Sequence, residues 1–147
     1  MFINGTDIYT TYGVTPLRGT YSALFEPVIP KAPLVIDIHT EDGERVYFQK
    51  DQTDPLLIHP TVQARSFIMP VALVASNSVD FFNKKTAFET LIVSGLLTIT
   101  SNKFSQVFRC YLEECQQYNQ LTPIANRKMA AVINLKLREI NPKNRTV

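Results

Sequence analysis

A chain of 147 residues that is 45% hydrophobic and 19% charged can bury a core and is too apolar to be disordered as a whole. A net charge of +2 at pH 7 is too small to indicate a nucleic-acid-binding protein, and no apolar run approaches the ~20 residues of a membrane helix. The first residues lack the basic and apolar regions of a signal peptide, so we expect none, and we expect one domain over residues 1–147.

The charge is distributed unevenly along the chain. Residues 1–62 carry a net charge of −4, residues 63–126 carry +1 and residues 127–147 carry +5. An acidic beginning and a basic end suit head-to-tail contact between identical subunits, because opposite patches attract. The alternative, which the sequence leaves open, is that both ends are simply solvated.

The first regular element that we expect along the chain is a β-hairpin over residues 34–48. Leu34, Ile36 and Ile38 alternate on one face of its first strand, which is the period of a half-buried strand. Asp42-Gly43 supplies a turn that suits the right-handed twist of the flanking strands.

Residues 49–61 contain two prolines and follow neither a helical nor a strand pattern. Three apolar residues lie in the middle of this segment: Leu56, Leu57 and Ile58. A loop with an exposed apolar tip often binds a partner, so these three residues are candidates for subunit contact. The alternative is that the tip folds back onto its own core.

Residues 63–76 predict a strand that is apolar on both faces. Alternate positions on one face are Phe67, Met69, Val71 and Leu73, and those on the other are Ile68, Pro70, Ala72 and Val74. Such a strand lies in the centre of a sandwich or is covered by another subunit. Because Pro70 cannot donate a hydrogen bond to a ladder, it indicates an edge or a bulge.

Residues 78–94 predict the only helix. Ser78 is a plausible N-cap, and the negative charge of Asp80 in the first turn suits the helix dipole. Lys85 and Glu89 form an i,i+4 pair, and Gly95 ends the helix. Four apolar residues follow helical spacing: Phe81, Phe88, Leu91 and Ile92.

The last part of the chain predicts three strands. Residues 96–101 and 106–114 form a pair joined through Asn102-Lys103. The strand over residues 128–138 alternates most clearly, with Met129, Ala131, Ile133, Leu135 and Leu137 on its apolar face. Together the elements predict an α+β fold, mainly an antiparallel β-sandwich flanked by one α-helix.

A short basic segment follows this last strand. Pro142 ends the ladder, so we expect residues 141–147 to leave the domain. The basic side chains Arg138, Lys143 and Arg145 are then candidates for contact with acidic groups of a neighbouring subunit. In that arrangement, deleting residues 142–147 would leave the monomer folded.

No pattern in the sequence indicates a catalytic centre or a cofactor site. The chain has no Gly-rich phosphate loop, no nucleophile elbow and no zinc-type ligand spacing. Asp37, His39 and His59 could hold a metal ion, but residues spaced like the first two are more often the solvated face of a half-exposed strand. We therefore expect no enzyme activity, no metal and no cofactor.

If residues 110–115 are extended, the two carboxylates and the two thiols in this segment point in opposite directions. Glu113 and Glu114 would point to opposite faces of a strand, which is a poor geometry for a catalytic carboxylate pair. Cys110 and Cys115 would lie roughly 16 Å apart on opposite faces, too far for a disulfide. We expect two reduced thiols in a reducing compartment.

Four segments of the chain resemble, in order and spacing, the N-terminal domain of the distal tail protein of tailed bacteriophages and prophages, especially those of Bacteroides-type hosts. They are INGTDIYTTYGVTPLRGTYSALFEP (residues 3–27), EDGERV (41–46), FFNKKTAFETLIVSGLLTIT (81–100) and INLKLREINPKNR (133–145). The resemblance covers nearly the whole chain.

The resemblance implies a structural subunit with a β-sandwich related to the tail-tube subunit. It implies copies in a hexameric ring, which joins the tube to the hub or baseplate around a lumen that DNA passes without specific binding. The partners would be copies of the chain and other tail proteins, and no membrane. The location would be the virion tail, after assembly in the bacterial host cytoplasm.

Two features depart from the resemblance. The chain has no residues left for a second, carbohydrate-binding domain, so direct recognition of the host is not expected. Tube lumens in that family tend to be acidic, so either residues 1–62 line the lumen or the chain is an outer adaptor.

Two other classes of function stay open. One is a ligand- or carbohydrate-binding β-sandwich module. Such modules usually bind through exposed Trp or Tyr side chains, so the absence of Trp disfavours this function, whereas the six Tyr remain compatible with it. The other is a metal-dependent enzyme that uses Asp37, His39 and His59.

Overall fold

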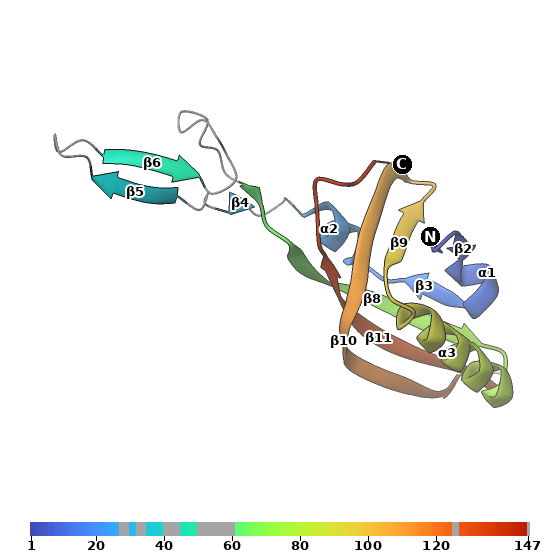
Figure 1. Cartoon of the computed structure of the whole chain (residues 1–147). Coiled ribbons are helices and arrows are strands. Elements are labelled where there is room, and N and C mark those ends of the chain that lie inside the picture. The colour runs from blue at the N-terminus through green and yellow to red at the C-terminus, as the bar shows by residue number, and fades with distance from the viewer. Residues whose placement is uncertain (27–29, 32–34, 40–44, 50–60, 125–126, 147) are drawn as a thin grey trace. The chain divides into compact units, whose positions relative to one another are not determined.

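The computed structural model describes residues 1–26, 30–31, 35–39, 45–49, 61–124 and 127–146 (Figure 1). The chain forms two compact units, a main unit of Met1–Pro27 with Ala64–Val147 and a smaller unit of Val28–Gln63. The expectation of one domain over residues 1–147 stays a prediction. None of the described helices is long and apolar enough to cross a membrane.

The main unit is built on a curled seven-stranded sheet with the order β2-β1-β9-β10-β11-β8-β3, and every described pairing in it is antiparallel (Figure 1). This mainly antiparallel architecture with few helices agrees with the α+β expectation. Its strands are β1 (Phe2–Ile3), β2 (Thr6–Asp7), β3 (Val14–Pro16), β8 (Arg65–Ala75), β9 (Leu97–Ser101), β10 (Phe104–Ile124) and β11 (Lys128–Glu139).

The pairing of β8 with β11 forms the centre of the sheet. The register runs without interruption from the pair Ala75–Met129 to the pair Arg65–Glu139. Alternate side chains of both strands are buried as expected, including Phe67, Met69, Val71, Leu73, Ile133, Leu135 and Leu137. The opposite face of β8 is partly open, because Ile68 is 45% exposed and Val74 is 41% exposed.

Pro70 occupies an edge position, as the sequence predicts. It lies opposite Asn134 of β11, and the ladder between β8 and β3 reaches only the next residue of β8, Val71, and does not include Pro70. The Pro70 carbonyl oxygen accepts hydrogen bonds from Leu17 N at 2.9 Å and Thr20 Oγ1 at 2.8 Å. The missing Pro70 N–H therefore costs no ladder hydrogen bond with β3.

The long helix α3 (Ser78–Ile92) is the helix that the sequence predicts, with a different N-cap. Asn77 is extended, and its Oδ1 accepts a 2.8 Å hydrogen bond from Asp80 N. Ser78 is thus the first helical residue instead of the cap. Three buried side chains of α3 join the core: Phe81, Phe88 and Ile92.

Two short helices, α1 (Ile8–Tyr12) and α2 (Thr20–Phe25), correct the expectation of a single helix. Neither is long enough to show helical periodicity, but local chemistry fixes α1. Asp7 Oδ1 accepts a hydrogen bond from Tyr9 N at 3.1 Å, and Gly13 ends the helix at φ +65°. A Cβ at Gly13 would also collide with the Val74 carbonyl oxygen.

Strand β10 is longer than the sequence predicts. It pairs with β9 through the expected turn and then continues to Ile124 beside β11. Its second half contains the segment Gln116–Leu121, which is polar on both faces and lacks the alternation that marks a half-buried strand. Hydrogen bonding to β11 therefore extends the strand where the sequence pattern does not.

The smaller unit contains two strand pairs. β5 (Val35–His39) pairs antiparallel with β6 (Arg45–Gln49), which confirms the two strands of the expected hairpin. β4 (Pro30–Lys31) pairs with β7 (Thr61–Val62). The expected turn at Asp42-Gly43 lies outside the described residues.

The N-cap of α3 gives a test of this fold. Asn77→Ala should lower the free energy of unfolding by about 0.5–2 kcal/mol, because it removes the acceptor for Asp80 N. Ser78→Ala is the matched control and should change stability less, since Ser78 is not the cap. Urea denaturation of both variants measures the difference, and a larger loss for Ser78→Ala would contradict the assigned helix start.

Candidate functional site

The described residues contain no cluster of three or more His, Cys, Asp or Glu side chains that could hold a metal ion. Asp37 and His39 lie on β5, where the structure describes the backbone and not the side chains, and His59 lies outside the described residues. The metal-site hypothesis for these three residues is therefore not tested.

The two cysteines are free thiols, as expected. Burial and the nearby charge of Glu139 raise the pKa of Cys110 to about 12. Partial burial and the charge of Glu89 also raise the pKa of the exposed Cys115. Because the thiolate is the reactive form, neither cysteine is an activated nucleophile at neutral pH.

The most unusual polar feature is a buried ion pair at one end of the β8–β11 ladder. Arg65 Nε donates a 2.7 Å hydrogen bond to Glu139 Oε2, and the two side chains are only 3% and 0% exposed. Buried charges are rare unless they are paired and hydrogen-bonded. The ladder register itself brings these two residues opposite each other.

Arg65 also holds the C-terminal end of α2. Its Nη2 donates to Leu24 O at 2.7 Å, and its Nη1 donates to Ala23 O at 2.9 Å and Glu26 O at 3.3 Å. The last carbonyl groups of a helix have no partners within the helix, and a cation near them is favourable. One guanidinium therefore connects β8, β11 and α2.

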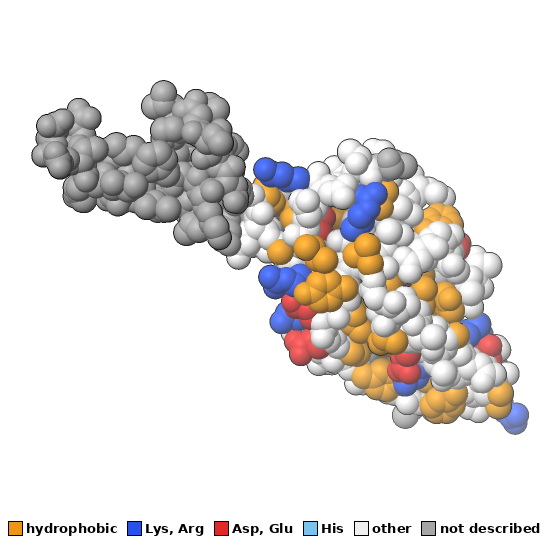
Figure 2. All heavy atoms as spheres, in the orientation of Figure 1, with side chains coloured by type: hydrophobic (Ala, Val, Ile, Leu, Met, Phe, Trp, Pro, Cys, Tyr) orange, Lys and Arg blue, Asp and Glu red, His pale blue; other side chains and the backbone are white. Residues whose placement is uncertain are grey.

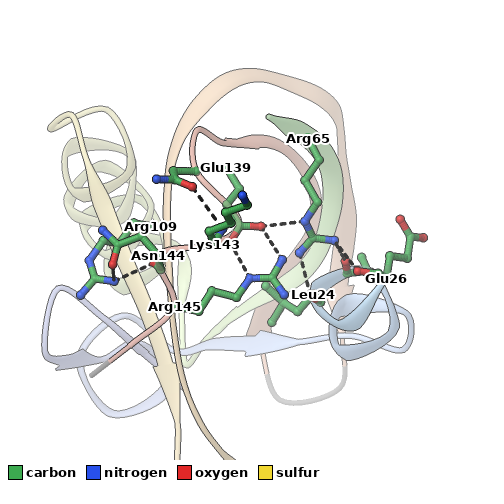
Figure 3. Close-up of polar contacts among 10 residues, drawn as sticks. Leu24, Glu26, Arg65, Arg109, Glu139, Lys143, Asn144 and Arg145 are labelled. Atoms are coloured by element: carbon green, nitrogen blue, oxygen red, sulfur yellow. Dashed lines mark hydrogen bonds and ion pairs between the residues drawn. The ribbon is translucent and has the colours of Figure 1, made fainter. Parts of the chain in front are cut away.

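Arg145 completes the network from the opposite side of Glu139. Its Nε and Nη2 donate hydrogen bonds of 2.8 Å to Glu139 Oε1 and Oε2, respectively. Figure 3 shows Arg65 and Arg145 converging on the Glu139 carboxylate. Burial alone would raise the pKa of Glu139, but hydrogen bonds from Arg145 and Arg65 outweigh it and hold that pKa below its ordinary value of 4.5.

The segment after β11 is docked onto its own main unit. Pro142 is buried, and Val107 N donates to Arg145 O at 3.0 Å. Arg109 holds the segment further by donating to Asn144 O at 2.8 Å (Figure 3) and to Thr146 O at 3.0 Å. The expectation that residues 141–147 leave the domain is therefore wrong for the described residues 141–146.

Aromatic packing supports the docked segment. The Arg145 guanidinium lies 4.8 Å from the centre of the Phe108 ring. Phe108 packs edge-to-face against Phe25 and Phe104 at 6.1 and 5.5 Å, respectively. Deleting residues 142–147 would thus remove both an ion-pair partner and apolar contacts, so we no longer expect it to leave the monomer unperturbed.

A second charged group lies on the outside of the β10–β11 pair. Arg138 Nη1 is 3.3 Å from Glu113 Oε1, and Lys136 Nζ is 3.7 Å from Glu113 and 3.5 Å from Glu114. A register shift between Leu112 and Glu114 places both carboxylates beside Lys136. The expectation that Glu113 and Glu114 point apart is therefore wrong, because the strand is bulged there.

The candidate contact residues from the sequence fall into three situations. Arg138 is in the exposed charged group, and Arg145 is mostly buried against Glu139. Lys143 is exposed beside the docked segment. Leu56, Leu57 and Ile58 lie outside the described residues, and a role in subunit contact stays a prediction for all six.

The surface of the main unit also has an apolar groove of about 550 Å³. Its apolar lining consists of Ile92, Val93, Leu96, Tyr111, Leu112 and Ile140. Val93, Leu96 and Ile140 are 68%, 55% and 57% exposed, so this apolar surface is open to a partner. On the face shown in Figure 2, acidic and basic side chains lie next to each other and hydrophobic side chains are exposed between them.

Sequence reasoning missed the buried network, although the sequence carries a signal for it. Arg65 has the same parity along β8 as the buried Phe67 and Met69, and Glu139 has the same parity along β11 as the buried Leu137. Two opposite charges at the ends of two apolar faces indicate a buried pair if the strands are neighbours. The order of the strands was the missing information.

The network predicts that replacing Arg65 destabilises the fold much more than replacing Arg138. Arg65→Met should lower the free energy of unfolding by about 3–5 kcal/mol, because it leaves Glu139 with one cation fewer and the end of α2 without donors. Arg138→Met is the matched control for an exposed pair and should cost only about 0.2–1 kcal/mol. Urea denaturation measures both, and similar losses for the two variants would contradict the assigned role of Arg65.

Because Glu139 is charged and paired in the folded protein, we expect the stability of the fold to decrease at acidic pH. Its folded-state pKa lies below the unfolded value of about 4.5, so its stabilisation is fully present above pH 4.5 and is lost as the pH falls through the folded-state pKa. Glu139→Gln should be less stable than the original chain at neutral pH, and the gap should narrow toward about pH 3. Denaturation across this range checks it, with the exposed Glu26→Gln as control; a pH-independent gap for Glu139→Gln would refute it.

The chain was also compared with known proteins. No protein-family model matches the chain, and no curated protein matches it. The functional proposal therefore starts from the residues and contacts of this chain, and from the resemblance in segment order described above.

Proposed function

We propose that this chain is a structural subunit of a bacteriophage tail. In this proposal, copies form a hexameric ring at the junction of the tail tube with the hub or baseplate, around the channel that DNA passes. The subunit works by packing against its neighbours, and it carries out no chemical reaction. A β-sandwich of the tail-tube type is part of the proposal.

The observation that carries this proposal is how the described charged residues of the main unit are used. Most of the close charge contacts tie elements of the chain together, in the buried network of Glu139 and in the exposed group around Glu113. Lys85 and Glu89 form a further pair along α3 at 2.6 Å. Charges arranged in this way stabilise a scaffold, whereas a catalytic site needs groups with pKa values tuned to proton transfer.

The exposed apolar surface is a second observation that supports the same proposal. A catalytic pocket encloses its substrate, but the apolar groove is open and its side chains Val93, Leu96 and Ile140 are more than half exposed. An apolar surface of this kind is typical of a protein-interaction site. Neighbouring subunits or other tail proteins are the partners that the proposal supplies.

Charge along the chain favours contact between unlike ends of neighbouring copies. The first 62 residues carry −4 and the last 21 carry +5. Docking of the C-terminal segment removes Arg145 from this account, because its guanidinium binds Glu139 and its side chain is only 15% exposed. Lys143 remains the exposed cation of the docked segment and becomes the preferred contact residue there.

The position of the ring depends on which part of the chain faces the channel. If residues 1–62 face inward, their net charge of −4 lets DNA slide through without adhering, because like charges repel. If the basic end faces inward, the chain is an outer adaptor around another ring. In both arrangements, the bound partners are copies of the chain and other tail proteins.

Direct observation of assemblies tests the proposal. Purified chain should form particles of about 100 kDa, the mass of six 16.7 kDa copies, in mass photometry, and rings in negative-stain images. A chain that stays monomeric at all protein concentrations and at low salt, alone and with its neighbouring tail proteins, would overturn the ring.

Reversing the charge of Lys143 tests whether charge contributes to the contact between subunits. Lys143→Glu should reduce ring formation at low salt without unfolding the monomer, because the side chain is exposed. The effect should shrink in high salt, as the Debye length falls from ~10 Å at 0.1 M to ~3 Å at 1 M. Lys128→Glu, also exposed, is the matched control, and equal effects of both variants would remove the specific role of Lys143.

A further inference from the structure

One edge of strand β10 is open over the second half of the strand. One side of β10 pairs with β11 from Cys110 to Ile124, but the other side pairs with β9 only as far as the pair Cys110–Leu97. Beyond Cys110, no described strand lies on that second side, and Figure 1 shows β10 running on past β9. The backbone groups that point to this side are available to another strand.

Part of this open edge is regular enough to act as a template. Register shifts interrupt the ladder with β11 before Gln117 and after Leu121. Between them, Gln117 to Leu121 pair residue by residue with Asn134 to Ala130. All five residues of this stretch are exposed, which leaves room for a second strand. Lys85 of α3 lies beside the stretch, with its Nζ 5.3 Å from the centre of the Tyr118 ring, so an incoming strand would pack next to the Lys85 side chain.

Between its two register shifts, the open edge lacks the features that usually prevent strands from pairing. Exposed edges in monomeric proteins carry Lys, Pro or bulges that block an incoming strand. Residues 115–121 read CQQYNQL, without a charge, a proline or a glycine. Gln and Asn side chains form ladders between paired strands, and Tyr118 and Leu121 are each 42% exposed and offer apolar surface.

We propose that the Gln117–Leu121 edge pairs antiparallel with the same edge of a second copy of this chain. Identical edges are complementary to each other about a twofold axis. Because the stretch is uncharged, this pairing opposes no like charges. The two carboxylates that precede the stretch on β10, Glu113 and Glu114, lie beside Lys136 and Arg138.

The register of the pairing follows from the limits of the regular stretch. If all five residues pair, Gln117 of one copy lies opposite Leu121 of the other, and Asn119 lies opposite itself. Five residues on each side form a small interface, so the contact is weak and becomes populated at high protein concentration. High local concentration in a larger assembly would favour it further.

This contact is distinct from the contact that would close a ring. A twofold contact joins two copies and then stops, whereas a ring needs two different surfaces on each subunit. The twofold contact and the ring can therefore fail independently. Dimers of the free subunit test the first, and particle images test the second.

Disulfide trapping tests the register. In a Cys115→Ser background, Asn119→Cys should give a covalent dimer under mild oxidation, because opposed Cα atoms in an antiparallel pair lie about 4.5–5.5 Å apart. Gln106→Cys in the same background is the matched control, since Gln106 is exposed on the same strand outside the open stretch. Cys110 is buried in both variants. Equal rates of dimer formation at both positions would overturn the proposal.

A charge on the edge tests the contact without a cross-link. Asn119→Lys places two like charges opposite each other and should shift the monomer–dimer equilibrium measured by analytical ultracentrifugation toward monomer by at least tenfold, a factor set by about 1.4 kcal/mol. Gln106→Lys should leave the equilibrium unchanged, and circular dichroism confirms that both variants fold. A dimer unaffected by Asn119→Lys, or no dimer of the original chain at the highest soluble concentration, would refute the pairing.

Discussion

The carboxylate of Glu139, held between Arg65 and Arg145, is the constraint that connects the parts of the main unit. Arg65 joins it to β8 and to the end of α2, and Arg145 joins it to the C-terminal segment. A charge that is fully buried is costly unless its partners are in place. The strand register, the position of α2 and the docking of the C-terminal segment therefore depend on one another.

The elements with clear periodicity could be predicted from the sequence. The alternation in β8 and β11 and the apolar spacing in α3 identified those elements, because burial of one face decides them locally. The short helices α1 and α2 and the second half of β10 could not be found in this way. Their residues owe their conformation to caps, to a neighbouring strand and to the Arg65 side chain, none of which produces a periodic pattern.

The same distinction applies to the candidate site. Three basic residues near the C-terminus are candidates for subunit contact from the sequence, but charge alone could not tell which were exposed. Arg145 turned out to be mostly buried because Glu139 lies six residues before it at the end of a buried face. Arg138 faces outward and meets Glu113, and the bulge in β10 after Leu112 brings Glu114 beside Lys136 as well. Partners like these depend on strand order and bulges, which the sequence does not display.

The two ends of β11 have different roles in the protein. At one end, Glu139 and Arg145 fix the C-terminal segment to the core, so that end is devoted to folding. Toward the other end, Val132 and its neighbours support the open edge of β10, where exposed backbone and uncharged side chains face outward. This separation suits the proposed assembling subunit, because groups used for contact must stay accessible after the fold is complete. Because β11 pairs with β8 without interruption on its other side, the proposed contact edge of β10 can be exposed while the core stays paired.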